Sequence, residues 1–178
     1  SIWESLSLPI VRAAALEAIR SISPKTLDLI ISNLSHPRIL EAAIAHPRCP
    51  RSTIKSKAFD SSESKPIRAA AATSPQCTAS ILKEMTLRDK PIFLRAIAAS
   101  HKNCPPEVLE ELLLLPLDGK IHIAAVANRN CPFKLMKAAA LSNPNPEIQG
   151  AALQNPKCPD TIRKAMLVIE SANTSIRV

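Results

Sequence analysis

The sequence predicts an all-α protein, a solenoid of about six two-helix repeats of ~27 residues each. Three observations predict this class. Cysteines recur at a nearly constant spacing, short apolar segments have helical periodicity, and prolines and polar residues separate those segments. No segment sustains the alternation of apolar and polar residues that is typical of a strand.

The cysteines set the repeat length. Successive cysteines are separated by 28, 27, 27 and 27 residues, and each lies in a short polar turn sequence. A further unit lies upstream, where Ser23-Pro24 takes the place of the cysteine and proline 26 residues before Cys49. A fixed period of this size is typical of solenoids, in which each unit packs chiefly on its neighbours. The cysteines that mark the register are Cys49, Cys77, Cys104, Cys131 and Cys158.

Each unit is predicted to contain two short helices. The first precedes the cysteine and is alanine-rich, as in residues 68–72, 95–99 and 123–127. Helices of about two turns do not persist alone in water, so neighbouring helices must hold them. The second helix follows the cysteine, and the proline directly after most cysteines fits its first position. Glu107, three residues after Cys104, fits a capping box at that helix start.

The repeats are predicted to occupy residues 11–167 as a single solenoid domain. Residues 1–10 are expected to form an N-terminal cap that contains the only tryptophan, Trp3. Residues 168–178 leave the pattern and are expected to form a C-terminal cap or tail. No apolar run approaches the ~18 residues of a membrane helix, so no transmembrane segment is expected and a cytoplasmic location is predicted.

Two alanine-rich segments and two turns carry a resemblance to a known family. The segments read Ile-Arg-Ala-Ala-Ala-Ala at 67–72 and Leu-Arg-Ala-Ile-Ala-Ala at 94–99. The turns read Asn-Cys-Pro-Pro-Glu-Val-Leu-Glu-Glu-Leu at 103–112 and Asn-Pro-Lys-Cys-Pro at 155–159. Over roughly residues 11–167 the unit resembles the leucine-rich repeat variant family.

That resemblance implies a right-handed superhelix in which α-helices alternate with 3₁₀ helices. The alanine-rich segments are therefore expected to be partly 3₁₀. A founding member of the family carries an iron–sulfur cluster in a separate cysteine-rich region. The present sequence has no clustered cysteines and none before Cys49, so no cluster is carried over. The family implies no common catalytic activity.

The cysteines are predicted to be core residues and not metal ligands. Equivalent positions on stacked helices lie about 8–10 Å apart, whereas thiolates that share one Zn²⁺ lie within about 4.6 Å of each other. A disulfide likewise needs Cα atoms within about 7 Å. His46 and His101 lie three residues before a cysteine, but Ser74, Asn128 and Asn155 fill the same position. These five residues share a short polar group that suits hydrogen bonding to the turn, so no metal or cofactor is expected.

A basic surface is the main candidate binding feature. The net charge of +8 and a pI near 9.5 favour an acidic partner. One repeat position, nine residues before the cysteine, is basic in two units and holds His122 and Gln149 in the next two. Further basic residues lie in the turn just before the cysteine, and residues at equivalent places form rows along a solenoid. The alternative is a solvated edge that keeps the protein soluble. The candidate residues for an anionic partner are Arg48, Arg68, Arg95, Lys102, Arg129 and Lys157.

No catalytic motif is apparent, because the sequence has no HExxH, no phosphate-binding glycine loop and no G-x-S-x-G. We expect a non-enzymatic binding scaffold that holds another protein on the solenoid surface. The first alternative is a nucleic-acid-binding module that contacts the phosphate backbone through the basic rows. Aromatic residues make up only 2%, which argues against stacking on single-stranded bases. A third hypothesis makes the chain the interaction arm of a larger metal or redox protein.

Overall fold

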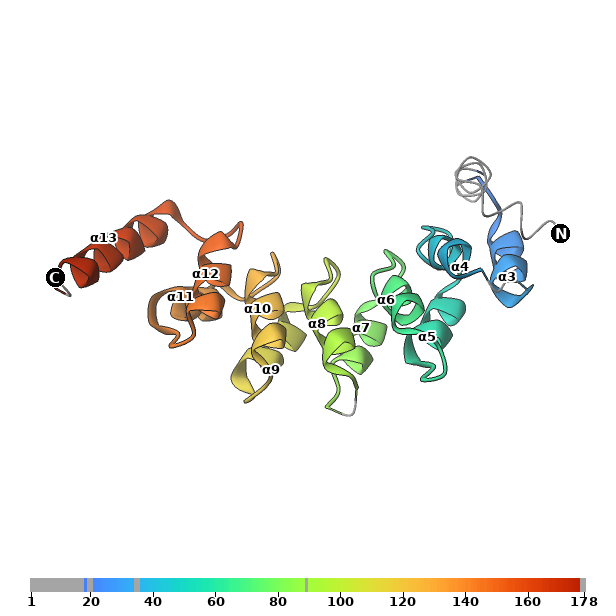
Figure 1. The fold of residues 1–178 in the computed structure, drawn as a ribbon, viewed down its shortest axis with the longest axis horizontal. Coiled ribbons are helices and arrows are strands. Elements are labelled where there is room, and N and C mark those ends of the chain that lie inside the picture. Colours follow the sequence, from blue (N-terminus) through green and yellow to red (C-terminus); the bar gives the residue numbers. More distant parts are fainter. Residues whose placement is uncertain (1–17, 19–20, 34–35, 89, 177–178) are drawn as a thin grey trace. The chain divides into compact units, whose positions relative to one another are not determined.

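Helices account for all the regular secondary structure in the described part of the computed structural model (Figure 1). The structure describes residues 18, 21–33, 36–88 and 90–176, and within them no strand is assigned. The predicted all-α class is therefore confirmed for these residues. In chain order the helices are α3 (Pro24–Asn33), α4 (Pro37–Ile44), α5 (Arg51–Phe59), α6 (Lys65–Ala72), α7 (Ala79–Met85), α8 (Ile92–Ser100), α9 (Pro106–Leu114), α10 (Gly119–Ala127), α11 (Phe133–Ser142), α12 (Pro146–Gln154) and α13 (Asp160–Ile176).

The chain divides after Ile81 into two compact units, and the division falls within α7. In the first unit α4 packs against both α3 and α6, and α5 packs against α6. Helix α4, which precedes Cys49, thus contacts the corresponding helix of the next repeat, α6. The core residues of this unit include Leu27, Ile44 and Ile54, none of which is exposed to solvent.

The second unit repeats this arrangement. Helix α10 packs against α8 on one side and α12 on the other, so the helices before the cysteines form one layer. Helices α9 and α11 form the other layer, and each packs against the helix that follows it in sequence, α10 or α12. The contacts within this unit agree with a two-helix repeat, because each helix is held by its neighbours in space.

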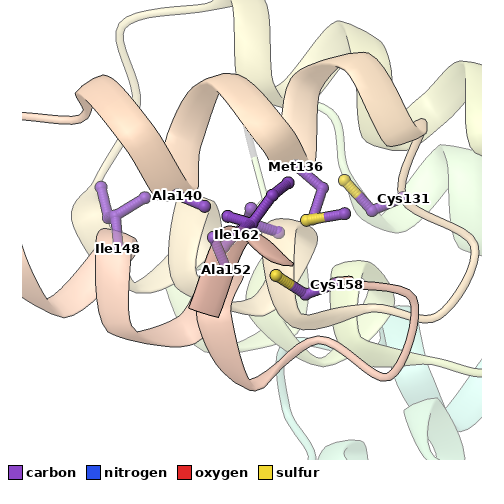
Figure 2. Close-up of a cluster of buried hydrophobic side chains, with 8 residues drawn as sticks. Cys131, Met136, Ala140, Ile148, Ala152, Cys158 and Ile162 are labelled. Atoms are coloured by element: carbon purple, nitrogen blue, oxygen red, sulfur yellow. The ribbon is translucent and has the colours of Figure 1, made fainter. Parts of the chain in front are cut away.

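A cluster of small and medium apolar side chains joins α10 to α13 (Figure 2). Ala140 and Ala152 are fully buried where α11 meets α12, and the absence of longer side chains lets the two helices approach closely. Met136 fills the space beside Cys131 and Cys158. The predicted role of these two cysteines as core residues agrees with this packing.

The alanine-rich helices differ from the expectation drawn from the family resemblance. Residues 65–72, 92–100 and 119–127 are α-helical throughout, and no 3₁₀ turn is assigned anywhere in the described residues. Alanine has the highest α-helix propensity of all residues, and packing on both sides supplies the stability that two isolated turns lack. The right-handed superhelix stays a prediction.

The helices after the cysteines begin one residue later than predicted. Pro50, Pro105 and Pro132 are N-cap residues with extended ψ angles of 139°, 146° and 128°. Their carbonyl groups accept the first helical hydrogen bonds, for example 3.0 Å from Met136 N to Pro132 O. The capping box predicted for Glu107 does not form, because no side chain caps the start of α9.

The last helix extends beyond the predicted end of the repeats. Helix α13 continues without a break from Asp160 to Ile176, so the loss of the repeat pattern at residue 168 does not end the helix. The predicted N-terminal cap at residues 1–10, with Trp3, lies outside the described residues. None of the described helices has both the length and the apolar character needed to cross a membrane.

Candidate binding surfaces at the repeat turns

A buried amide links the turns of the second unit. Asn128 is 5% exposed, and its Nδ2 atom donates hydrogen bonds to Ala99 O at 2.7 Å and His101 O at 2.9 Å. Its Oδ1 atom accepts from Asn130 N at 2.8 Å, two residues along the turn. One side chain therefore shapes its own turn and satisfies carbonyl groups at the end of α8, one repeat earlier.

Asn155 makes the same contacts one repeat later. Its Nδ2 atom donates to Val126 O at 2.6 Å and Asn128 O at 2.9 Å, and its Oδ1 accepts from Lys157 N at 2.8 Å. The two asparagines thus connect three successive turns. This result confirms that the short polar residue three positions before the cysteine hydrogen-bonds the turn.

The histidines at this position use their ring nitrogen in the same way. His46 Nδ1 accepts from Arg48 N at 3.0 Å, and His101 Nδ1 accepts from Asn103 N at 3.1 Å. A nitrogen that accepts a backbone N–H hydrogen bond carries no proton and has no free lone pair for a metal. The two His-x-x-Cys sequences are therefore turn-forming elements.

A second polar position links the turns, and sequence reasoning missed it. Asn130 Nδ2 donates to Lys102 O at 2.8 Å and to Cys104 O at 3.0 Å, across one repeat. In the first unit Gln76 Nε2 donates to Pro47 O in the corresponding way. The signal in the sequence is an amide residue directly before the cysteine, which recurs at residues 76, 103 and 130.

Four of the cysteines, Cys49, Cys77, Cys104 and Cys131, are buried thiols with little tendency to ionise. Burial raises the pKa of Cys49, Cys77 and Cys131 from 9.0 to about 11, and that of Cys104 to about 12. These thiols are protonated at neutral pH, whereas metal binding and nucleophilic attack need the thiolate. Among the described residues, no group of three or more His, Cys, Asp or Glu side chains is placed to hold a metal ion.

At the position nine residues before the cysteine, the basic side chains donate hydrogen bonds that stabilise the fold. Arg68 Nε donates to Ala58 O at 3.1 Å, and Arg95 Nε donates to Thr86 O at 3.2 Å. Both carbonyls belong to the C-terminal end of the preceding helix, where backbone oxygens lack helical partners and carry partial negative charge. At the same position His122 Nε2 lies 3.1 Å from Leu112 O and 2.9 Å from Leu115 O.

Arg68 and Arg95 therefore differ from the exposed basic row that the sequence predicts. Arg68 is half-buried and Arg95 is only 7% exposed. Periodicity alone showed that the two arginines share a repeat position, but it did not show that the position faces the end of the neighbouring helix. Neither residue is placed to form part of an open surface for a large anionic partner.

The basic residues of the turns are exposed. Arg48 lies in the first unit, and Lys102, Arg129 and Lys157 lie in the second. The last three residues lie on turns that Asn128, Asn130 and Asn155 connect, so the hydrogen bonds hold one cation in each of three adjacent turns. Acidic side chains are close in sequence, because α9 exposes Glu107, Glu110 and Glu111 directly after the first of these turns.

Comparison with known proteins adds no assignment. No protein-family model, no curated protein and no solved structure matches the chain. The resemblance to the leucine-rich repeat variant family thus stands on residues 67–72, 94–99, 103–112 and 155–159 alone. Any function has to be argued from the surfaces of the chain itself.

Proposed function

We propose that this protein is a non-enzymatic scaffold of helical repeats, similar to the leucine-rich repeat variant family, that binds another protein. The observation that carries the proposal is a run of exposed apolar side chains on α13. Leu167, Val168 and Ile169 are 65%, 66% and 47% exposed. Consecutive large apolar side chains on a protein surface favour a protein partner over a nucleic acid.

The repeat supports this interpretation of the apolar run on α13. Leu167 lies nine residues after its cysteine, and the same position holds Ala58 and Ala140, which are fully buried, and Thr86 and Leu113, which are half-buried. Ala140 belongs to the cluster that packs α11 against α12. Leu167 therefore occupies the side of the repeat that normally receives the next helix. We propose that a helix of the partner protein packs there.

The test is a comparison of two charge substitutions at equally exposed leucines. Leu167→Glu places a charge in the proposed interface, and Leu114→Glu is the control on α9, where the leucine is 67% exposed. Partners are isolated from an extract of the source cells with each variant, and the affinity of each purified partner is then measured by calorimetry. We expect a partner that binds wild type and Leu114→Glu alike and binds Leu167→Glu at least ~30-fold more weakly, as expected for a buried charge that costs about 2 kcal/mol or more. Equal binding by all three proteins would exclude this surface.

A second function is favoured by the three exposed cations on the connected turns, Lys102, Arg129 and Lys157. One positive charge in each successive repeat suits the regular spacing of phosphates in a nucleic acid. The adjacent carboxylates of α9 reduce the local positive potential, which is why we rank this function second.

A salt titration with non-specific duplex DNA tests this second function. If the turns bind phosphate, the triple variant Lys102→Ala/Arg129→Ala/Lys157→Ala lowers the salt slope by about 0.9 for each lost contact. The control replaces three exposed lysines on helix faces, Lys134, Lys137 and Lys164, and leaves the slope nearly unchanged. Absence of binding at low salt would exclude the nucleic-acid function.

We also propose a cytoplasmic location. All five cysteines are buried, and none of them forms a disulfide. Cysteines that are not joined in disulfides are typical of a reducing compartment, where disulfides rarely persist. Localisation of a fluorescent fusion by microscopy tests this proposal, and accumulation outside the cytoplasm would contradict it.

A further inference from the structure

The second unit contains a pocket of about 430 Å³ next to the end of α7. Its wall combines residues of α7 and of the segment after it with Arg95 of α8 and residues at the end of α9. Leu112 and Leu115 supply an apolar side, and Lys83 and Arg88 supply exposed cations. The volume is within the range of about 300–1,000 Å³ that is typical of small-ligand sites.

Arg95 distinguishes this pocket from the rest of the surface. The side chain is 7% exposed, and its Nε atom is used by the hydrogen bond to Thr86 O. Its Nη2 atom is buried and has no hydrogen-bond partner. Buried polar atoms nearly always have partners, so an exception in a pocket wall indicates a donor that a ligand can satisfy.

The repeat shows that the fold does not need a guanidinium at this position. In the next repeat His122 contacts the end of the preceding helix with a single nitrogen, Nε2, which lies near both Leu112 O and Leu115 O. Arginine has five N–H donors and a permanent, delocalised charge, and the helix end uses only the Nε donor. The helix end therefore leaves the other donors and the charge of Arg95 unused, and Arg95 is one of the residues that line the pocket.

The electrostatic character of the pocket follows from its lining. Three cations, Lys83, Arg88 and Arg95, line the pocket together with one carboxylate, Glu111. Several arginine and lysine donors in one cavity favour an oxyanion, and the desolvated guanidinium strengthens each charge-assisted hydrogen bond. Leu112 and Leu115, which also line the pocket, favour an apolar group beside that anion.

We propose that this pocket binds a small ligand in which an oxyanion, a phosphate or a carboxylate, is joined to an apolar group. The oxyanion accepts hydrogen bonds from Arg95, Lys83 and Arg88, and the apolar group packs on Leu112 and Leu115. This site is separate from the apolar run on α13 and from the cationic turns. It therefore does not depend on the proposed protein-binding function.

The binding test is an NMR titration of the full chain at constant ionic strength. The probes are phenyl phosphate, phenylacetate and inorganic phosphate, with sodium chloride as the reference salt. We expect shifts in the amide resonances of Thr86, Leu87 and Arg88 and in the side-chain Nε–H of Arg95. Phenyl phosphate should bind about tenfold more tightly than inorganic phosphate, because its ring buries apolar surface. Whichever aromatic probe binds more tightly identifies the ligand as a phosphate or a carboxylate.

Two variants make the result decisive. Arg95→His imitates His122 and retains a donor for the helix end, whereas Lys83→Ala/Arg88→Ala removes two exposed side chains whose loss leaves the fold intact. Each is expected to weaken binding at least about tenfold, and Lys137→Ala on α11 is expected to leave it unchanged. Shifts that sodium chloride reproduces, shifts spread over the whole unit, or equal binding by wild type and both variants would overturn the proposal.

Discussion

Individual side chains hold the repeats in register. Asn128 and Asn155 each donate two hydrogen bonds to the previous repeat and accept one from their own turn. His46 and His101 accept the equivalent bond within the turn. The sequence identified this position as polar and structural. It did not identify the carbonyl groups that the amides reach, because these lie 27 to 29 residues away.

Replacement of Asn155 by alanine tests the importance of these bonds. Asn155 is 1% exposed, so the variant leaves Val126 O, Asn128 O and Lys157 N without their present partner in buried or half-buried surroundings. We expect the free energy of unfolding, measured in urea, to fall by about 2–3 kcal/mol. Gln154→Ala, at an exposed neighbour, should change it by less than about 0.5 kcal/mol. A similar small change for both variants would contradict this role.

The buried thiols predict a loss of stability in alkali. Burial raises the pKa of Cys49, Cys77 and Cys131 from 9.0 to about 11, and of Cys104 to about 12. The folded state therefore keeps these protons when the unfolded chain releases them. Their contribution to stability is fully present below pH 9 and is lost as the pH rises toward 11.

Urea unfolding at a series of pH values from 7 to about 10.5 measures this effect. We expect a steeper fall in the free energy of unfolding above pH 9 for wild type than for Cys104→Ala, by about 1.4 kcal/mol per pH unit at most. Identical profiles for the two proteins would show that Cys104 ionises equally in both states.

At the scale of elements, short helices form because their neighbours hold them. Helix α7 has seven residues and α6 has eight, lengths that are unstable in isolation. The sequence predicted one short helix before and one after each cysteine, and α6 and α7 occupy these places around Cys77. The first residues of α5, α9 and α11 were predicted one position too early, because proline suits both the N-cap with extended ψ and the first helical position.

Gly150 offers a test of the helical interior. It lies in the middle of α12, at the repeat position that holds Ala69 and Ala96 in other units. A Cβ atom added at Gly150 meets nothing within 4 Å, and its φ angle is not positive. Gly150→Ala should therefore raise the free energy of unfolding by about 0.5–1 kcal/mol, because alanine loses less backbone entropy in a helix.

Gly119→Ala is the matched control for this substitution. Gly119 is the first residue of α10, where helix propensity counts less, and its added Cβ lies 3.7 Å from Asn145 Nδ2, an ordinary contact. We expect a change of a few tenths of a kcal/mol, measured by thermal unfolding. If Gly150→Ala gives no larger gain than Gly119→Ala, the interior of α12 is not a regular helix in solution.

At the scale of the whole molecule, stability is expected to be local. Helices α10 to α13 share one cluster in which Met136 is fully buried. Met136→Ala should lower the local free energy of opening by about 2–5 kcal/mol, because the shortened side chain leaves a cavity. Each repeat packs chiefly on its neighbours, so the effect should decline along the chain.

Amide hydrogen exchange measures how far the effect of Met136→Ala extends. We expect faster exchange in α11 and α12 and unchanged exchange in α4 and α5, which belong to the first unit. Leu141→Ala, at a side chain that is 38% exposed, is the control in the same helix. Equally accelerated exchange in both units would show that the chain unfolds as one cooperative body.

The sequence by itself determined the all-α class, the repeat length and the core position of the cysteines. The repeat length follows from the cysteine spacing. The helices follow from the local preferences of alanine and proline, which act within one or two helical turns. Only the tertiary structure decided that Arg68 and Arg95 bind the ends of neighbouring helices and that Asn130 joins two turns. It also decided that Leu167 is exposed at a position that is buried or half-buried in the other repeats. The reason is that these roles depend on which atoms the fold brings within hydrogen-bonding or packing distance. A repeat period shows which positions are equivalent, but it does not show which atoms surround them.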